Sequence, residues 1–139
     1  MLLEGNLQGS QHIGIPVRDI EASKAFYGGF GFQEIMYAEI PVSGDAVKAV
    51  MMSKSGLTIE LYQLVGEELE EIATRKDGHV DHIAMTVLDI DKAFDDLQAA
   101  GMDIIEEAPV SLDFWENGCK YFTIRGPNGE KLEFNQIIQ

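Results

Sequence analysis

The feature that most constrains the fold of this chain is an internal repeat. Residues 12–20 and 82–90 lie 70 positions apart and share His, Ile, Val, Asp and Ile in the same register. Near the end of each copy, residues 56–63 and 129–136 share Gly, Glu and Gln at an offset of 73. An insertion of three residues between these matches accounts for the change in offset. Two matches in the same order predict a chain made of two copies of one module.

The strand pattern is the same in both copies. Alternating apolar residues predict strands over residues 11–17 and 81–87. Three more strands are expected in each copy, near residues 33–40, 46–53 and 57–63 and near residues 103–108, 120–125 and 130–137. A module of about 60 residues buries too little surface to be stable alone, so the two copies are expected to pair. The prediction is an α+β fold in which two βαβββ modules have mixed sheets that curve around a central pocket.

One helix is expected after the first strand of each copy. Asp19 and Asp89 precede these helices and are candidate N-cap residues, because a carboxylate accepts the free backbone N–H groups of a first turn. The second helix has a regular apolar stripe. The first has a weaker stripe, formed by Ala22, Phe26 and Phe30.

These elements predict a single domain over residues 1–139. Its first module is expected over residues 10–64, a linker over 65–78 and the second module over 79–139. The linker has room for a short helix, which Glu71 and Arg75 would stabilise because they are four positions apart.

Strand alternation places four ionisable residues on the same kind of surface. In the first strand of each copy, the apolar residues that a helix should cover alternate with His12 or with His82. In the last strand of each copy, they alternate with Glu60 or with Glu133. One His and one Glu from each copy are therefore expected on the helix-free, concave face of the sheet.

This set of side chains suits a divalent transition metal. A single His at the start of a strand is usually structural, and a single Glu between apolar residues usually faces water, so the prediction depends on the joint pattern. Two imidazoles and two carboxylates suit Zn²⁺, Ni²⁺, Co²⁺, Fe²⁺ or Mn²⁺, and not Ca²⁺. His79 is a weaker candidate ligand, because the matching position in the first copy is Gly9.

Other residues are candidates for contact with a substrate. Tyr121 is expected on the concave face of its strand, and its equivalent at the offset of 73 is Lys48. Residues 112–118 form a loop rich in aromatic and polar residues, in which Trp115 and Asn117 are candidates to line the mouth of the pocket. Solvated strand and loop residues are the alternative explanation for all four.

Composition limits the kinds of partner. The 24 acidic and 10 basic residues give a net charge of −14, which repels nucleic acid and anionic membranes. Cys119 is the single cysteine, so no disulfide forms within the chain. The first residues lack the pattern of a signal peptide. We expect a cytoplasmic protein, a homodimer, that acts on a small molecule.

The chain resembles the vicinal-oxygen-chelate superfamily, which includes glyoxalase I, bleomycin and fosfomycin resistance proteins, methylmalonyl-CoA epimerase and extradiol dioxygenases. The residues that carry the resemblance are His12-Ile13-Gly14 with Val17 and Asp19-Ile20, Thr58-Ile59-Glu60-Leu61, Asp81-His82-Ile83-Ala84, and Gly126-Pro127-Asn128-Gly129 through Leu132-Glu133-Phe134. The resemblance covers nearly the whole chain and implies the fold shared by glyoxalase, bleomycin resistance protein and dihydroxybiphenyl dioxygenase.

Within that superfamily, a His/Glu/His/Glu set is most similar to bacterial glyoxalase I (lactoylglutathione lyase), which implies one Ni²⁺, Co²⁺ or Zn²⁺ ion per site. The epimerases are similar but commonly have Gln at the position of Glu60. The dioxygenases have no ligand there, and the bleomycin-binding members usually lack the ligands. The expected activity is a glyoxalase-I-like isomerisation. The alternatives are a metal-dependent epimerase or isomerase of an acyl thioester or sugar derivative, and a ligand-binding resistance protein.

The mechanism implied is proton transfer next to a carbonyl group. The metal ion would polarise the carbonyl and stabilise the enediolate that forms. Glu133 or Glu60 would leave the ion, act as general base and then return the proton. Return to the neighbouring carbon gives isomerisation, and return to the other face of the same carbon gives epimerisation.

Overall fold

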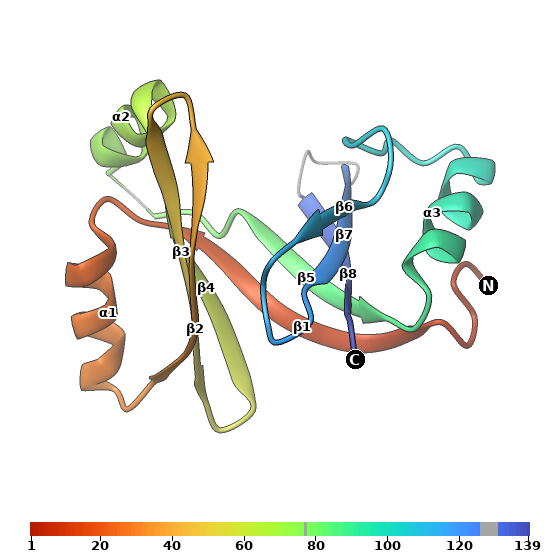
Figure 1. Ribbon diagram of the computed structural model, residues 1–139, viewed down its shortest axis with the longest axis horizontal. Helices are drawn as coiled ribbons and strands as arrows, with labels where there is room; N and C mark the ends of the chain where they lie inside the picture. The colour runs from red at the N-terminus through yellow and green to blue at the C-terminus, as the bar shows by residue number, and fades with distance from the viewer. Residues whose placement is uncertain (77, 126–130) are drawn as a thin grey trace. The chain divides into compact units, whose positions relative to one another are not determined.

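The computed structural model describes residues 1–76, 78–125 and 131–139, so the turn expected at residues 126–129 lies outside the described residues. The chain forms two compact units (Figure 1). One unit comprises residues 12–81, and the other comprises residues 1–11 together with residues 82–139. Strand β1 (Leu7–Pro16) begins in the second of these units and ends in the first.

The unit of residues 12–81 contains a four-stranded mixed sheet and two helices. Its sheet has the order β2-β3-β4-β1, in which β1 and β4 are parallel and the other neighbours are antiparallel. Helix α1 packs on β3 and β4. After β1, the elements of this unit are α1 (Ile20–Gly29), β2 (Gln33–Val42), β3 (Asp45–Lys54), β4 (Leu57–Gln63) and α2 (Gly66–Thr74).

The other unit repeats this arrangement. Its strands have the order β5-β8-β7-β6, with β5 and β8 parallel and the other neighbours antiparallel. Helix α3 packs on β7 and β8 (Figure 1). The elements are β5 (His82–Val87), α3 (Ile90–Ala99), β6 (Val110–Leu112), β7 (Cys119–Arg125) and β8 (Lys131–Ile137). The predicted α+β fold of two βαβββ modules is confirmed.

The predicted helix starts are also confirmed. The side chain of Asp19 accepts a hydrogen bond from the backbone N–H of Ala22, and that of Asp89 accepts one from Lys92, at 3.0 and 2.9 Å. Each bond satisfies a backbone N–H that has no partner within its helix. Because each cap directly follows a first strand, it fixes where the chain leaves the sheet.

The linker helix is α2, and it contains the expected ion pair. The guanidinium group of Arg75 meets both carboxylate oxygens of Glu71, at 2.7 Å each. The first helix differs from its prediction, because Phe26 and Phe30 are both 62% exposed. Their rings contact each other edge to face instead of packing on the sheet.

One predicted strand is wrong. Residues 103–108 form only an isolated bridge, between Ile104 and Ile124, and the strand in this part of the chain is β6. The carboxylate of Glu106 accepts the backbone N–H of Thr123 at 2.6 Å, so a side chain takes the place of a backbone carbonyl in the ladder. Pro109 has no N–H to offer to a neighbouring strand.

The N-terminal segment packs on the second module, which the repeat did not predict. Leu3 is buried in the core cluster of α3, β7 and β8. The backbone carbonyl of Asn6 accepts the N–H of Leu88 at 3.0 Å, and the Asn6 side chain bonds to the backbone of Asp89. The segment thus covers the end of β5 and the start of α3.

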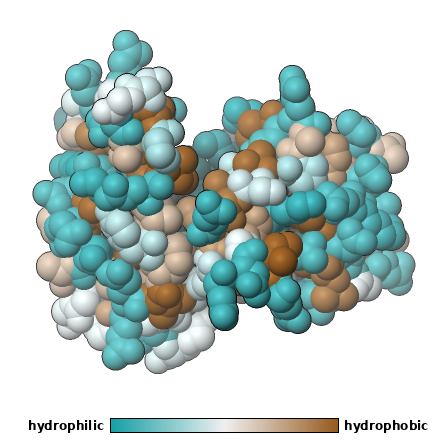
Figure 2. Space-filling view, viewed as in Figure 1, coloured by the Kyte–Doolittle hydropathy of each residue, from teal (hydrophilic) through white to brown (hydrophobic). Residues whose placement is uncertain are grey.

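Figure 2 shows hydrophilic side chains over much of one face of each unit, with hydrophobic ones between them. Among the described residues, no helix is long and apolar enough to cross a membrane.

Candidate functional site

The first pair of candidate ligands lies within the unit of residues 12–81. His12 is on β1, Glu60 is on β4, and the His12 Nε2 atom is 3.2 Å from the Glu60 Oε2 atom. His12 is only 3% exposed. Packing of a small sheet does not by itself require a buried His. The expected face of both residues is confirmed, because Ile15, Val17, Ile59 and Leu61 belong to the cluster under α1.

The second pair repeats this geometry in the other unit. The Nε2 atom of His82, on β5, is 3.4 Å from the Oε2 atom of Glu133, on β8. Both residues are 9% exposed. Burial of ionisable groups is costly unless a partner compensates them, so two such pairs in one small chain require a physical reason.

Strand register explains how each pair forms. Glu60 lies opposite Gly14 across the parallel pair β1–β4, and Glu133 lies opposite Ala84 across β5–β8. Gly14 and Ala84 are each two positions after a His, on the same face. Because these two residues are small, each carboxylate can extend over its neighbour toward the imidazole.

The separations suit two ligands of one metal ion, and they lie at or beyond the long end of the range for an N–H···O hydrogen bond. A charge-assisted N–H···O bond is about 2.7–2.9 Å long, which is shorter than 3.2 or 3.4 Å. Two ligand atoms that are each about 2.1 Å from one ion are about 3.0 Å apart at octahedral angles and about 3.4 Å apart at tetrahedral angles. Each His–Glu pair therefore has the spacing of two neighbouring positions around a transition metal.

The carboxylate of Glu133 has a further polar neighbour. The Nδ2 group of Asn135 donates a hydrogen bond to the Oε1 atom of Glu133 at 2.8 Å. Thr123 lies opposite Glu133 and Tyr121 lies opposite Asn135 across β7 and β8. Tyr121 is thus on the face of Glu133, as expected, since Phe122 and Ile124 belong to the core cluster on the other side.

Tyr62 takes the matching position beside Glu60. Burial raises the pKa of the Tyr62 hydroxyl well above its usual range, and the negative charge of Asp81, a hydrogen bond with Asp81 and the charge of Glu60 raise it further. The backbone N–H of Asp81 also donates to the carbonyl of Gly14 at 2.8 Å. Asp81, which directly precedes His82, is therefore held to this unit by two contacts.

The predicted face of Lys48 is wrong. Lys48 lies opposite Gln63, whose side chain accepts the N–H of Ile20 at the start of α1, so Lys48 is on the helix side. Register pairs Met51 with Glu60 and Thr123 with Glu133, so β3 and β7 match at an offset of 72 instead of 73. An offset wrong by one residue reverses the face of a strand residue.

The loop after β6 contains the other two candidates. Trp115 has a positive φ of 66° and is half-buried, whereas Asn117 is exposed. The indole Nε1 of Trp115 is buried and has no hydrogen-bond acceptor in the part of the chain that the structure describes. A role of either residue toward a substrate stays a prediction.

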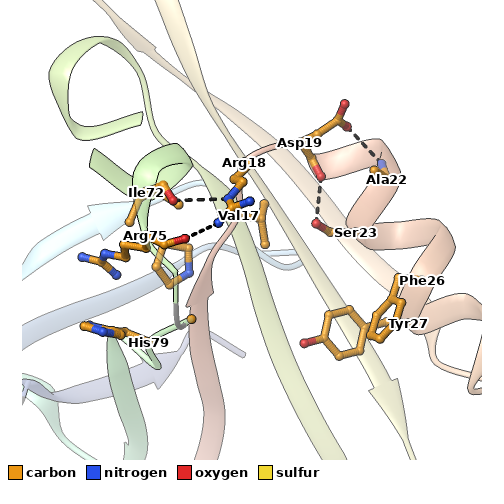
Figure 3. A pocket seen from close by; sticks show the side chains of 12 residues that line it. Val17, Arg18, Asp19, Ala22, Ser23, Phe26, Tyr27, Ile72, Arg75 and His79 are labelled. Atoms are coloured by element: carbon orange, nitrogen blue, oxygen red, sulfur yellow. Dashed lines mark hydrogen bonds between the residues drawn. The ribbon is translucent and has the colours of Figure 1, made fainter. Parts of the chain in front are cut away.

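A separate pocket of about 510 Å³ lies beside α1 in the unit of residues 12–81 (Figure 3). His79 lines this pocket together with Arg18, whose guanidinium donates to the backbone carbonyls of Ile72 and Arg75 at 3.3 and 2.5 Å. Arg18 thereby satisfies carbonyls at the end of α2. None of the four candidate metal ligands is among the described residues that line this pocket.

Comparison with known proteins agrees with this arrangement. A relative, the uncharacterised protein YwbC of Bacillus subtilis (strain 168), is 32% identical over 125 residues, which are 90% of this chain and 94% of the relative. The structure of methylmalonyl-CoA epimerase from Mycobacterium tuberculosis superposes with a TM-score of 0.79 at 18% identity, covering 100% of this chain and 94% of that one.

Methylmalonyl-CoA epimerase from Streptomyces coelicolor, in complex with 2-nitronate-propionyl-CoA, gives a TM-score of 0.74 at 21% identity, covering 96% of this chain and 99% of that one. These two structures share the fold and are epimerases, whereas the sequence was expected to be most similar to glyoxalase I. The model of the Glyoxalase/Bleomycin resistance protein/Dioxygenase superfamily matches residues 9–134. The chain therefore belongs to this superfamily.

Proposed function

We propose that this chain is a divalent-metal-dependent enzyme that moves a proton at a carbon next to a carbonyl group, and that the reaction is an epimerisation or a related isomerisation of a small metabolite. The observation that carries the proposal is the spacing of the two His–Glu pairs, 3.2 and 3.4 Å, which suits neighbouring ligands of one transition metal. An acyl thioester or a sugar derivative is the proposed class of substrate.

The proposal brings the four residues together around one ion. Among the described residues, His12, Glu60 and His82 each offer one ligand atom and could together hold a metal ion. Glu133 is proposed as the fourth ligand.

The donor set suggests Ni²⁺, Co²⁺ or Zn²⁺, with Fe²⁺ or Mn²⁺ as further possibilities. Such an ion supplies Lewis acidity toward the carbonyl oxygen of a substrate. The carboxylate of Glu133 or of Glu60 accepts the proton from the adjacent carbon, and a carboxylic acid returns it. Epimerisation requires an acceptor on one face of that carbon and a donor on the other, and two carboxylates from two repeats can supply both.

Epimerisation is favoured over the glyoxalase-I-like reaction because the solved structures with high similarity include methylmalonyl-CoA epimerases. The second candidate is the glyoxalase-I-like isomerisation. The carboxylate of Glu60 favours it, since a Glu at this position resembles glyoxalase I. A metal-free, ligand-binding resistance protein is the third candidate, and the burial of His12, His82 and Glu133 argues against it. The homodimer expected from the sequence stays a prediction.

The test is proton exchange with solvent. Metal-loaded protein would be incubated in D₂O with methylmalonyl-CoA, with the hemithioacetal of methylglyoxal and glutathione, and with a panel of hydroxylated carbonyl compounds, and deuterium would be followed by NMR. We expect deuterium at the carbon next to the carbonyl with one class of compound, and a large loss of exchange in Glu133→Gln and Glu60→Gln. Absence of exchange across the panel would refute both proton-transfer reactions.

A further inference from the structure

We propose that Asn135 has two roles at this site: its amide nitrogen positions Glu133, and its amide oxygen accepts a hydrogen bond from a hydroxyl or N–H group of the substrate. The inference rests on the proposed function and narrows its substrate to a carbonyl compound that carries such a donor group. Asn135 lies in β8, two positions after Glu133 and therefore on the same face of the strand.

The first role follows from a short hydrogen bond in a buried place. Asn135 is 3% exposed, and its Nδ2 group donates to the Oε1 atom of Glu133 at 2.8 Å. The other carboxylate oxygen, Oε2, is the one that is 3.4 Å from His82. Asn135 thus fixes the plane of the carboxylate and leaves Oε2 directed at the imidazole. Such neighbours of a ligand commonly alter metal affinity by about 10- to 100-fold.

The orientation of the Asn135 amide is determined by its surroundings. Reversing the amide would place its oxygen against a carboxylate oxygen, and two acceptors repel each other. In the orientation present, Nδ2 also contacts the Sγ atom of Cys119 at 4.0 Å, so both acceptors lie on the nitrogen side. The oxygen atom must therefore point away from Glu133.

The second role follows from that oxygen atom. Oδ1 of Asn135 is buried and has no hydrogen-bond donor among the described residues. A buried acceptor without a donor lowers stability, and native proteins seldom keep one without a use. This acceptor belongs to Asn135, whose side chain contacts Glu133, a candidate metal ligand and proton acceptor. A donor group on a bound substrate would satisfy it.

The first module differs at the matching position. Tyr62 lies two positions after Glu60, and its hydroxyl is hydrogen-bonded to Asp81, the residue before His82. The residue two positions after each Glu has therefore diverged. Tyr62 bonds to Asp81, which precedes His82, whereas Asn135 offers an acceptor beside Glu133. The donor group of the substrate is expected on the side of the second module.

The experiment uses two ligands that differ by one donor. Glycolate and methoxyacetate can chelate a metal through the same oxygen atoms, but methoxyacetate has no hydroxyl proton. Their affinities for metal-saturated protein would be measured by calorimetry. We expect wild-type protein to prefer glycolate by at least about tenfold, since a polar site discriminates against an analogue that leaves it unpaired. Equal affinities would overturn the acceptor role.

Two variants separate the two roles. In Asn135→Leu the side chain has a similar shape but lacks both the amide nitrogen and the amide oxygen. This variant should lose the preference for glycolate and should bind the metal at least about tenfold less tightly. Asn135→Asp keeps an acceptor and loses the amide donor, so the preference for glycolate should remain. Unchanged metal affinity in Asn135→Leu would overturn the positioning role. Circular dichroism would check that both variants are folded.

These measurements require metal and ligand binding and no turnover. If proton exchange fails while the glycolate preference depends on Asn135, the proposed reaction is wrong and the role of Asn135 stands. If exchange occurs and the preference is absent, the reaction stands and the acceptor role is wrong. A suitable control is Gln98→Leu, because Gln98 is an exposed amide residue on α3, away from the candidate ligands; it should leave both affinities unchanged.

Discussion

Asn6 holds both backbone polar groups of Asp89 with one side chain. Its Nδ2 group donates to the Asp89 carbonyl at 2.8 Å, and its Oδ1 atom accepts the Asp89 N–H at 2.7 Å. Asp89 is also the N-cap of α3, so a residue 83 positions away supports the start of that helix. The two-sided bond explains why residues 1–11 group with residues 82–139.

Replacing Asn6 should therefore destabilise the protein. Asn6→Ala leaves the backbone N–H of Asp89 without its partner, which costs about 1–3 kcal/mol, whereas the Asp89 carbonyl still accepts the N–H of Ala93. We expect the free energy of unfolding in urea to fall by roughly 1–3 kcal/mol, with fast hydrogen exchange at the start of α3. Asn117→Ala is the control, because Asn117 is exposed. Equal stability of the two variants would show that the N-terminal segment does not support the second module.

Tyr62 should make stability depend on pH in the alkaline range. Its pKa is raised in the folded chain, chiefly by burial and by Asp81. Its protonated form thus adds to stability below about pH 10, and this contribution declines as the pH rises further. Tyr62→Phe loses the bond to Asp81, which is worth about 1 kcal/mol, but also loses this pH dependence.

The measurement is urea unfolding of wild type and Tyr62→Phe at several pH values. We expect the wild type to be more stable at neutral pH and the difference to narrow above about pH 10. The other tyrosines are common to both proteins, so the difference isolates Tyr62. Two curves that stay parallel through this range would contradict the proposed environment of the hydroxyl.

The small residue opposite Glu133 should be needed for metal binding. Ala84 is fully buried and lies opposite Glu133 across β5 and β8. Ala84→Val adds bulk where the carboxylate extends toward His82, so we expect much weaker metal binding together with a stability cost of about 1–3 kcal/mol. Ala93→Val is a matched control, because Ala93 is equally buried on the helix side.

Competition with a coloured chelator would report both metal affinities. The control should lose a similar amount of stability and retain its affinity for the metal. If both variants bind metal like the wild type, the path of the Glu133 side chain toward His82 is not the one described.

Much of the fold was predictable because the repeat tests every local assignment twice. The strand at residues 57–63 and both N-caps were predicted from patterns that recur in the two copies. The strand expected over residues 103–108 was wrong because Glu106 replaces a ladder carbonyl with its side chain, and no hydrophobic pattern reveals that. The packing of Leu3 and Asn6 was not predictable for a similar reason, since it depends on contacts distant in sequence.

The candidate site was also predictable only in part. The faces of His12 and Glu60 followed from alternation, and their separation of 3.2 Å agrees with it. The face of Lys48 did not follow, because the insertion between the copies is divided between two loops and shifts the match of β3 to β7. The contact between Asn135 and Glu133 could have been suspected from the i, i+2 spacing alone, but its direction required coordinates.

The central claim is that four residues hold one metal ion, and elemental analysis tests it most directly. Purified protein would be reconstituted separately with Ni²⁺, Co²⁺ and Zn²⁺, and the bound metal per chain would be compared with that of Glu60→Gln and Glu133→Gln. We predict one ion per chain in the wild type and weaker binding in both variants, even though the two residues belong to different modules. Wild-type protein that retains no stoichiometric transition metal, or metal content unchanged in both variants, would contradict the account.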